Sequence, residues 1–578
     1  MARTKHRILL AGIPLTLLSL LLFFEPAVLA QNPPPPGDNS GSQAQRFRRE
    51  SEEAEKTLKG EPSRPAIEMP EEKAEAPAEE EVTFVLKQVR VTGTTLYPPG
   101  TFEQASAPLL GKDVTLADLD RVMQKIKERY GKDGYMTANV YLPEQDIVAG
   151  DIEIRVLEGR MGDLRTEGNR WRSRRSLERY VHIKKNETLN LRLLQKDLLR
   201  LNNQGDLEAR TVLAPGKETG ATDVVLKVTD KFPWHVGASI DNQGSRLTGK
   251  TRYGVTARSS NVTGRGDSFF SNSVMTDYSV SEYAHYEIPL TSRGLAAGFD
   301  YTLSRNILGK EYRSGKIEGT TQFFHYYFSQ ELYLSEKLEI EAATGMDIRR
   351  SLRTADDEMT SHDELRILYG STEFVLNDRF GRTVFKPTVS FSTAGFLGAS
   401  HRGHPSASRD GTGGFFFKYE QALTRIQRMP FGSYAMIRSQ FQFPTHTLPS
   451  SEQFQLGGFY TVRGYPEGDF MSDWGFSFGF DWILQAYGLP RSWKLPFAKV
   501  PLRNQLEPVI FTDLGYGKVK KAQPGERGEK FLMGLGGGLR YRFDEYASVR
   551  LEWATAVGDH PQPGNGASTF YLASQVEV

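Results

Sequence analysis

The chain has 578 residues and a net charge of +1, from 72 basic and 71 acidic residues. This balance gives no general attraction for nucleic acid, and the mean hydropathy of −0.46 excludes a bundle of membrane-spanning helices. Because the chain has no cysteine, a disulfide framework, a thiolate metal site and thiol catalysis are excluded as well.

Residues 1–30 have the features of a secretory signal. Arg3, Lys5 and Arg7 form a basic start, residues 8–24 are apolar, and small residues precede Gln31. An uncleaved membrane anchor is the alternative, but Pro14 and the small residues at the end favour cleavage. We expect an exported protein, either soluble in the periplasm or a β-barrel in the outer membrane.

Residues 31–80 are a linker by composition, rich in proline and in acidic residues. Within it, residues 43–58 contain neither proline nor glycine and form a possible plug helix. Only Phe47 and Leu58 are large and apolar there, so such a helix is polar on all sides and requires a wet cavity. Disorder explains the same composition equally well.

Two small α/β modules follow, at 81–159 and 160–231, each with the predicted order β-α-α-β-β, in which residues 99–110 would form the first, weaker helix of the first module. In the first, a helix begins at Thr115, where Asp118 completes a capping-box pattern. Leucines recur at helical spacing in the second module between 191 and 201. Each module leaves an edge strand beside a helix, where an extended peptide can add a strand.

From residue 232 to the end, the pattern changes to short segments with period-two alternation. In the clearest case, Leu539, Tyr541 and Phe543 alternate with Arg540 and Arg542. Roughly fifteen to seventeen such segments follow one another, which is too many for an ordinary β-sandwich and is typical of a membrane barrel. The connections alternate between tight turns and long polar loops, as outer-membrane barrels require.

One loop interrupts this alternation, around residues 457–473. It carries Val462-Arg463-Gly464-Tyr465, and about fifty residues later comes a strand on which Phe511, Asp513 and Gly515 share one face. An acid on a barrel strand is expected to point into the lumen, where Arg463 can reach it with its planar guanidinium. Such a pair contributes roughly 1 to 4 kcal/mol before desolvation. The alternative is that Arg463 is an ordinary surface charge.

These motifs resemble those of the two-partner secretion transporters, the family of the haemolysin and filamentous haemagglutinin secretion proteins. The sequences VRGY at 462–465 and FTDLG at 511–515 resemble the two signature motifs of their superfamily, in the expected order. Leu142-Pro143-Glu144-Gln145-Asp146 resembles the first POTRA domain of the family, and Leu213-Ala214-Pro215-Gly216 the second. The resemblance implies a sixteen-stranded transmembrane antiparallel β-barrel in which Arg463 meets Asp513 inside.

The resemblance also implies a function. The chain would bind an unfolded exoprotein in the periplasm through its POTRA domains and secrete it through the barrel in the bacterial outer membrane, surrounded by lipid. We expect no enzyme activity, cofactor, metal, nucleotide or nucleic acid. The candidate client-binding residues of the first POTRA domain are Leu116, Leu119, Met123, Tyr130, Tyr135 and Leu142.

Three other interpretations stay open. A barrel-assembly factor shares both signature motifs but is favoured by more than two POTRA modules, and a diffusion porin lacks such modules. A barrel-embedded hydrolase would need a serine facing a histidine. Residues 475–479 match the G-x-S-x-G pattern, but they lie inside an alternating strand and not at the strand-turn-helix junction that a nucleophile elbow requires. The chain ends in Val576-Glu577-Val578, whereas many outer-membrane barrels end in an aromatic residue. Either Phe570 or Tyr571 takes that part, or this barrel is recognised differently.

Overall fold

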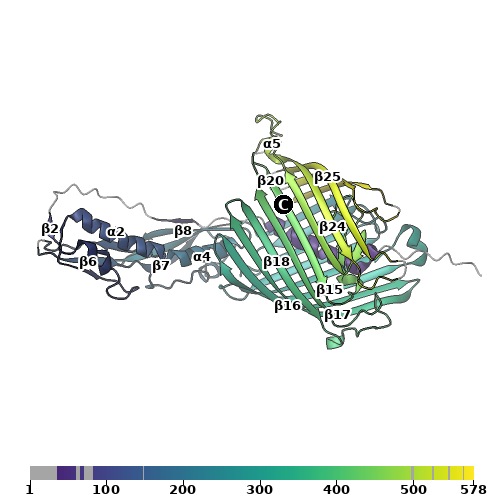
Figure 1. The fold of residues 1–578 in the computed structure, drawn as a ribbon, viewed down its shortest axis with the longest axis horizontal. Helices are drawn as coiled ribbons and strands as arrows, with labels where there is room; N and C mark the ends of the chain where they lie inside the picture. Colours follow the sequence, from purple (N-terminus) through teal and green to yellow (C-terminus); the bar gives the residue numbers. More distant parts are fainter. Residues whose placement is uncertain are drawn as a thin grey trace, which may run out of the picture.

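The computed structural model describes residues 36–59, 66–69, 83–147, 149–495, 500–523, 526–543, 547–563 and 565–578. Two small α/β modules extend as a stalk from a large barrel, and helix α1 (Ser40–Lys59) lies inside that barrel (Figure 1). The expected signal at 1–30 lies outside the described residues. Among the residues described, no helix combines the length and the apolar character that crossing a bilayer requires.

The first module has a three-stranded sheet in the order β3-β6-β5 and a short β2–β4 pair. Its elements are β2 (Phe84–Val85), β3 (Gln88–Thr92), η2 (Glu103–Ala105), η3 (Ala107–Leu109), β4 (Asp113–Val114), α2 (Leu116–Lys132), β5 (Asn139–Tyr141) and β6 (Asp151–Leu157). Helix α2 begins with the expected capping box of Thr115 and Asp118. The weak helix predicted over 99–110 is instead two 3-10 turns, because Pro108 lies between Gly100 and Gly111, both with positive φ.

The second module repeats the order of the first. It consists of β7 (Arg160–Glu167), α3 (Arg174–Glu178), α4 (Leu191–Asn202), β8 (Leu207–Pro215) and β9 (Ala221–Asp230). A short linker strand, β1 (Ala66–Glu68), pairs in parallel with β8, so the sheet order is β1-β8-β9-β7. The chain therefore fills one edge of this sheet with its own linker.

Sixteen antiparallel strands close the barrel. They are β10 (Trp234–Asp241), β11 (Arg252–Ser259), β12 (Ser268–Met275), β13 (Ser279–Pro289), β14 (Leu295–Ile307), β15 (Glu318–Leu334), β16 (Leu338–Ala355), β17 (Glu358–Asp378), β18 (Gly381–Ser392), β19 (Phe417–Arg428), β20 (Tyr434–Pro444), β23 (Trp474–Ile483), β24 (Leu506–Lys518), β25 (Glu529–Phe543), β26 (Ala547–Ala556) and β27 (Ser568–Glu577). The last strand pairs with the first, and Val578 exchanges two backbone hydrogen bonds with Val236. The predicted barrel and its strand number are confirmed.

Side chains alternate across the wall as a barrel in lipid requires. On the last two strands, Leu551, Trp553 and Phe570 are exposed on the outside, whereas Glu552 and Tyr571 are buried inside. Of the two aromatic residues proposed to replace the missing C-terminal one, only Phe570 faces outward.

The second module is fixed to the end of the barrel where β11 joins β12 and β13 joins β14. Arg200 of α4 donates two hydrogen bonds to Glu331 of β15, at 2.7 and 3.0 Å. Arg172 donates to the carbonyl oxygen of Ser260 at 3.0 Å, and a ring nitrogen of His182 lies 3.0 Å from the Ser292 hydroxyl. These contacts mark the module-bearing rim of the barrel.

A buried acid organises the first module. Glu158 accepts hydrogen bonds from the backbone N–H groups of Thr95 and Leu96, at 2.8 and 3.0 Å, and from the Tyr130 hydroxyl at 2.8 Å. The Thr95 hydroxyl also donates to it. Burial raises the pKa of Glu158, but these hydrogen bonds outweigh it and hold the pKa below its ordinary value.

We expect Glu158→Gln to lower the free energy of unfolding of this module by about 1–3 kcal/mol, because one hydrogen-bonded oxygen is lost at a buried site. The native pKa of Glu158 is depressed, so its stabilisation is present above its unfolded pKa, about 4.3, and is lost as pH falls through the native value. Urea melts of the soluble 83–231 fragment at pH 7 and pH 3.5 measure this. A variant that melts like the wild type at pH 7 would contradict the prediction.

Candidate functional site

A long loop folds back into the barrel between β21 (Phe454–Leu456) and β22 (Phe470–Ser472), which pair with each other. We call residues 457–469 the inward loop. Gly457 and Gly458 enter it with φ of +96° and +101°, a backbone conformation that glycine adopts without a steric penalty. Val462 and Tyr465 are buried against the barrel wall. The loop therefore packs as part of the interior.

Arg463, which is 1% exposed, forms the centre of the site. Its Nε and Nη2 donate to the two carboxylate oxygens of Asp513 at 2.7 and 2.8 Å, and its backbone N–H donates to the same carboxylate at 3.0 Å. Nη1 donates to Glu552 at 3.1 Å, and Nη2 also donates to Asp481. The guanidinium carbon lies 3.5 Å from the centre of the Phe511 ring, which adds a cation–π contact.

Three neighbouring parts of the wall supply the carboxylates: β23 carries Asp481, β24 carries Asp513 and β26 carries Glu552, all buried. Arg540 of β25 donates to Glu552 at 2.8 Å and to Asp481 at 2.6 Å. Arg438 of β20 adds a contact to Asp481 at 3.3 Å. Because desolvation offsets most of the attraction in a buried ion network, its main effect is to fix the loop in one place.

The wall is shaped to receive the loop backbone. A Cβ atom added to Gly534 would lie 2.0 Å from the carbonyl oxygen of Arg463, and one added to Gly515 would lie 2.7 Å from a Val462 methyl group. The Tyr571 hydroxyl accepts a hydrogen bond from the N–H of Gly464 at 3.0 Å. Small residues on the wall therefore permit a contact that any side chain would block.

The structure brings together all seven residues named for this site: Val462, Arg463, Gly464, Tyr465, Phe511, Asp513 and Gly515. Asp481, Glu552 and Arg540 were not among the partners predicted from the sequence. The signal was present, because each occupies the polar face of one of the most regular alternating segments. The strand register, which places these three side chains around Arg463, cannot be predicted from the sequence.

Helix α1 crosses the lumen as a polar element. Its buried polar residues are Ser40, Ser42, Gln43, Gln45, Glu50, Ser51 and Glu55. Glu50 pairs with Arg252 at 2.8 Å, and Lys56 pairs with Glu373 at 2.9 Å. Its one buried aromatic side chain, Phe47, contacts Phe270 of the wall. The contacts between helix and barrel are thus mostly hydrogen bonds and ion pairs.

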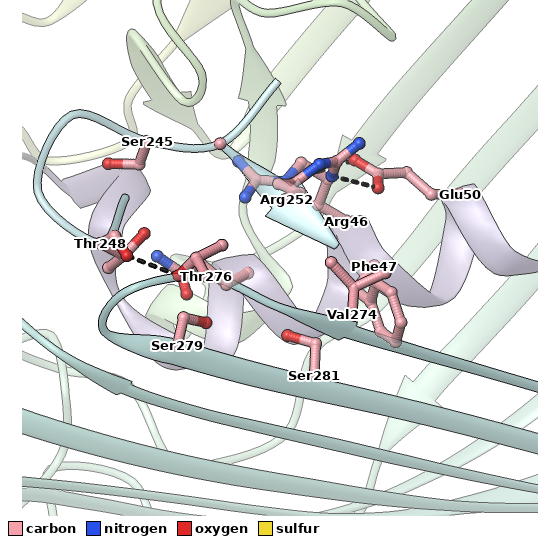
Figure 2. A pocket seen from close by; sticks show the side chains of 12 residues that line it. Arg46, Phe47, Glu50, Ser245, Thr248, Arg252, Val274, Thr276, Ser279 and Ser281 are labelled. Carbon is pink, nitrogen blue, oxygen red and sulfur yellow. Dashed lines mark hydrogen bonds and ion pairs between the residues drawn. The ribbon is translucent and has the colours of Figure 1, made fainter. Parts of the chain in front are cut away.

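The helix also contacts the inward loop. Arg46 lies 3.4 Å from the Glu467 carboxylate. In the turn just before the helix, a Cβ added to Gly37 would lie 2.4 Å from the carbonyl oxygen of Gly468. A small cavity lies between the helix and β11, β12 and β13; Figure 2 shows Arg46, Phe47 and Glu50 lining it from the helix. The helix and the loop therefore fill the lumen jointly.

Two of the six candidate client-binding residues of the first module are fully buried, and the other four are partly buried. Leu119 and Tyr130 are buried in its core, and Leu116, Met123, Tyr135 and Leu142 pack partly buried against that core. A side chain in the core cannot contact a client in this conformation, so this part of the prediction is wrong for Leu119 and Tyr130. The apolar helical face that suggested them is explained by packing against the sheet.

The part of the chain that the structure describes contains neither a metal-binding cluster nor a nucleophile elbow. No group of histidine, cysteine and acidic side chains there is placed to hold a metal ion. The G-x-S-x-G sequence at 475–479 runs through the middle of β23, without the strand-turn-helix geometry of a nucleophile elbow.

Comparison with known proteins gives consistent matches. The family model described as "Haemolysin secretion/activation protein ShlB/FhaC/HecB" matches residues 220–541, more than half of the chain. The model of the ShlB-type POTRA domain matches residues 84–159. The heme/hemopexin transporter protein HuxB of Haemophilus influenzae is 26% identical over 420 residues, which cover 67% of this chain and 69% of HuxB.

Solved structures agree on the fold. CdiB from Escherichia coli matches with a TM-score of 0.72 and 20% identity, over 94% of this chain and 99% of the CdiB chain. BamA from Haemophilus ducreyi lacking POTRA domains 1-3 matches with a TM-score of 0.51 and 12% identity, over 86% of this chain and 100% of the other. At 20% and 12% identity, these two matches show that the fold is shared and nothing more.

A closed sixteen-stranded barrel with an N-terminal POTRA region and an arginine-held loop in its lumen defines an outer-membrane barrel protein of the POTRA-bearing class. The chain belongs to the haemolysin secretion/activation protein family ShlB/FhaC/HecB. It is accordingly a two-partner secretion transporter, with its barrel in the bacterial outer membrane and its POTRA region in the periplasm. The rim to which the second module is fixed is therefore the periplasmic rim.

Proposed function

We propose that the first POTRA domain captures an unfolded exoprotein by strand addition and that the client then crosses the lumen after helix α1 has left it. The observation that carries this proposal is the polar, ion-paired interface between α1 and the barrel, which water can replace when the helix moves. The loss of a large apolar interface would not be compensated in that way.

The open edge strand β5 supports capture by the first domain. In the second domain the linker strand β1 already occupies the edge at β8, whereas β5 in the first domain has β6 on one side only. Exposed apolar side chains lie beside this edge, at Met136 and Tyr141. Pairing through the backbone gives binding that tolerates different client sequences, which suits a client that is still unfolded.

We infer that transport needs no chemistry within the chain and that folding of the client outside the cell draws it through. In support, no group of histidine, cysteine and acidic side chains among the described residues is placed to hold a metal ion. Export by reconstituted vesicles that depended on added ATP or on an ion gradient would overturn this inference.

Tethering the helix to the wall tests the proposal. The hydroxyl oxygens of Ser40 in α1 and Thr321 in β15 lie 2.9 Å apart, and the chain has no cysteine of its own. Ser40→Cys combined with Thr321→Cys should form a disulfide that holds α1 in the lumen. We expect export of the exoprotein into the medium to fall to background after oxidation and to return after reduction.

A matched disulfide controls for the oxidation itself. Ser281 and Ser304 face each other on β13 and β14 with their hydroxyl oxygens 3.2 Å apart, so Ser281→Cys with Ser304→Cys joins two wall strands without holding the helix. This pair should export normally in both redox states. Normal export by the oxidised helix tether, with its disulfide shown to be complete, would refute the plug model.

A further inference from the structure

One connection at the periplasmic rim differs from all its described neighbours. The chain runs from β23 to β24 through residues 484–505. We call the described part of this connection, 484–495 and 500–505, the rim loop; it includes the one-turn helix α5 (Leu502–Gln505). The other described connections on this rim are far shorter: 260–267, 290–294, 335–337, 379–380 and 429–433. Outer-membrane barrels normally have tight turns at the periplasmic rim, so a loop of this length there suggests a function.

The rim loop points sideways, away from the barrel axis. Figure 1 shows α5 and its loop projecting from the edge of the barrel beside β20 and β25. Its two described parts are joined where the N–H of Leu502 donates to the carbonyl oxygen of Trp493 at 2.8 Å. The guanidinium carbon of Arg503 lies 5.1 Å from the centre of the Tyr487 ring. The described parts of the loop are therefore folded on themselves, outside the path through the lumen.

The loop combines exposed apolar surface with unbalanced positive charge. Tyr487 is 50% exposed, Trp493 55% and Leu495 39%. Arg491, Lys494 and Arg503 are basic, and residues 484–505 contain no acidic residue. None of these three cations forms an ion pair with a carboxylate of the described residues.

The surface beside the loop is also apolar and exposed. Phe431, in the neighbouring turn 429–433, is 87% exposed. Below it on the outer wall, Trp482 of β23 and Ile510 of β24 are also exposed and face the lipid. The Tyr487 hydroxyl lies close to Gly432, so the loop contacts this turn. The rim loop thus begins where the lipid-facing wall ends.

We propose that the rim loop anchors the barrel in the periplasmic leaflet of the outer membrane and binds anionic phospholipid there. The rings of Tyr487 and Trp493 and the Leu495 side chain enter the interface, where amphipathic aromatic residues are most stable. Arg491 and Lys494 reach lipid phosphates while their aliphatic stems stay in the apolar layer. The sideways direction favours lipid over a client, which passes through the lumen.

A spin label tests the position of the loop. In the cysteine-free full-length chain, Leu495→Cys carries a nitroxide in vesicles of phosphatidylethanolamine and phosphatidylglycerol. Val255→Cys on the outer wall is the lipid reference, and Arg402→Cys in an extracellular loop is the water reference. We expect the label at 495 to be more accessible to oxygen than to a water-soluble nickel complex, as at 255. Accessibility like that at 402 overturns the proposal, and protection that appears only when exoprotein is added assigns the loop to the client instead.

The charge component is tested by native mass spectrometry of the full-length protein with phosphatidylglycerol. The triple variant Arg491→Gln, Lys494→Gln, Arg503→Gln should retain this lipid about tenfold less than the wild type. A charge-matched control changes three exposed extracellular residues to glutamine, Arg313, Arg402 and Lys521. Equal retention by the two triple variants would refute anionic lipid binding at the rim loop.

Discussion

Replacing Arg463 by alanine is expected to abolish export while leaving a folded barrel. The substitution leaves the buried carboxylates of Asp513, Asp481 and Glu552 with too little positive charge. Removing one partner from a buried ion network costs about 3–5 kcal/mol, which lowers the equilibrium constant for seating the loop by two powers of ten or more, at about 1.4 kcal/mol each. Export into the medium measures function, and heat-modifiable migration on gels measures barrel assembly.

Single changes to the acids should have smaller effects than the change to the arginine. Asp513→Asn leaves Arg463 paired with Asp481 and Glu552, so we expect part of the export activity to remain. The charge swap Arg463→Asp with Asp513→Arg should restore little export. The new acid at position 463 would face the carboxylates of Asp481 and Glu552, which repel it.

The control for this series is Arg527→Ala. Arg527 is half exposed on an extracellular loop and pairs with Asp559 at 2.6 Å. An exposed pair of this kind contributes about 0–1 kcal/mol, so this variant should export normally. Normal export by Arg463→Ala would show that the seated inward loop is not required.

Gly534→Val is expected to displace the inward loop without removing any charge. A Cβ at this position would lie 2.0 Å from the carbonyl oxygen of Arg463, a contact that only a backbone shift can relieve. Overpacking of this kind costs roughly 1–3 kcal/mol. Here the cost destabilises the seated position of the inward loop, because the clash is with the loop backbone. A buried reporter, Val462→Cys, should then react with a maleimide about tenfold faster or more, since about 1.4 kcal/mol is a factor of ten.

Gly370→Val provides the matched control on another barrel strand. A Cβ at Gly370 would have its nearest neighbour at 4.0 Å, so the same substitution fits without strain. The reporter at position 462 should stay as slow in this background as in the otherwise unchanged protein. Equal labelling rates in the Gly534→Val and Gly370→Val backgrounds would mean that the loop tolerates the contact.

The architecture could be predicted from the sequence, because the signals for strands, turns and helix starts are local. Period-two alternation follows from the geometry of a strand between lipid and water, and it predicted the barrel correctly. The glycine-rich loop and the single acid among apolar neighbours indicated Arg463 and Asp513, and the resemblance of their two motifs to those of the transporter superfamily favoured their pairing over a surface charge. Capping at Thr115 located the start of α2. The same kind of signal misled for Leu119 and Tyr130, since an apolar helical face predicts burial as readily as binding.

The tertiary structure decided which residues meet. Asp481 and Glu552 reach Arg463 only because the register of β23 to β26 brings their inward positions to one level. Helix α1 was no more probable than disorder in the sequence, because a helix in a polar lumen needs no apolar stripe. Likewise, three residues of linker form β1 only because β8 offers an open edge. In each case the stabilising partners lie far away along the chain, so no local pattern encodes the contact.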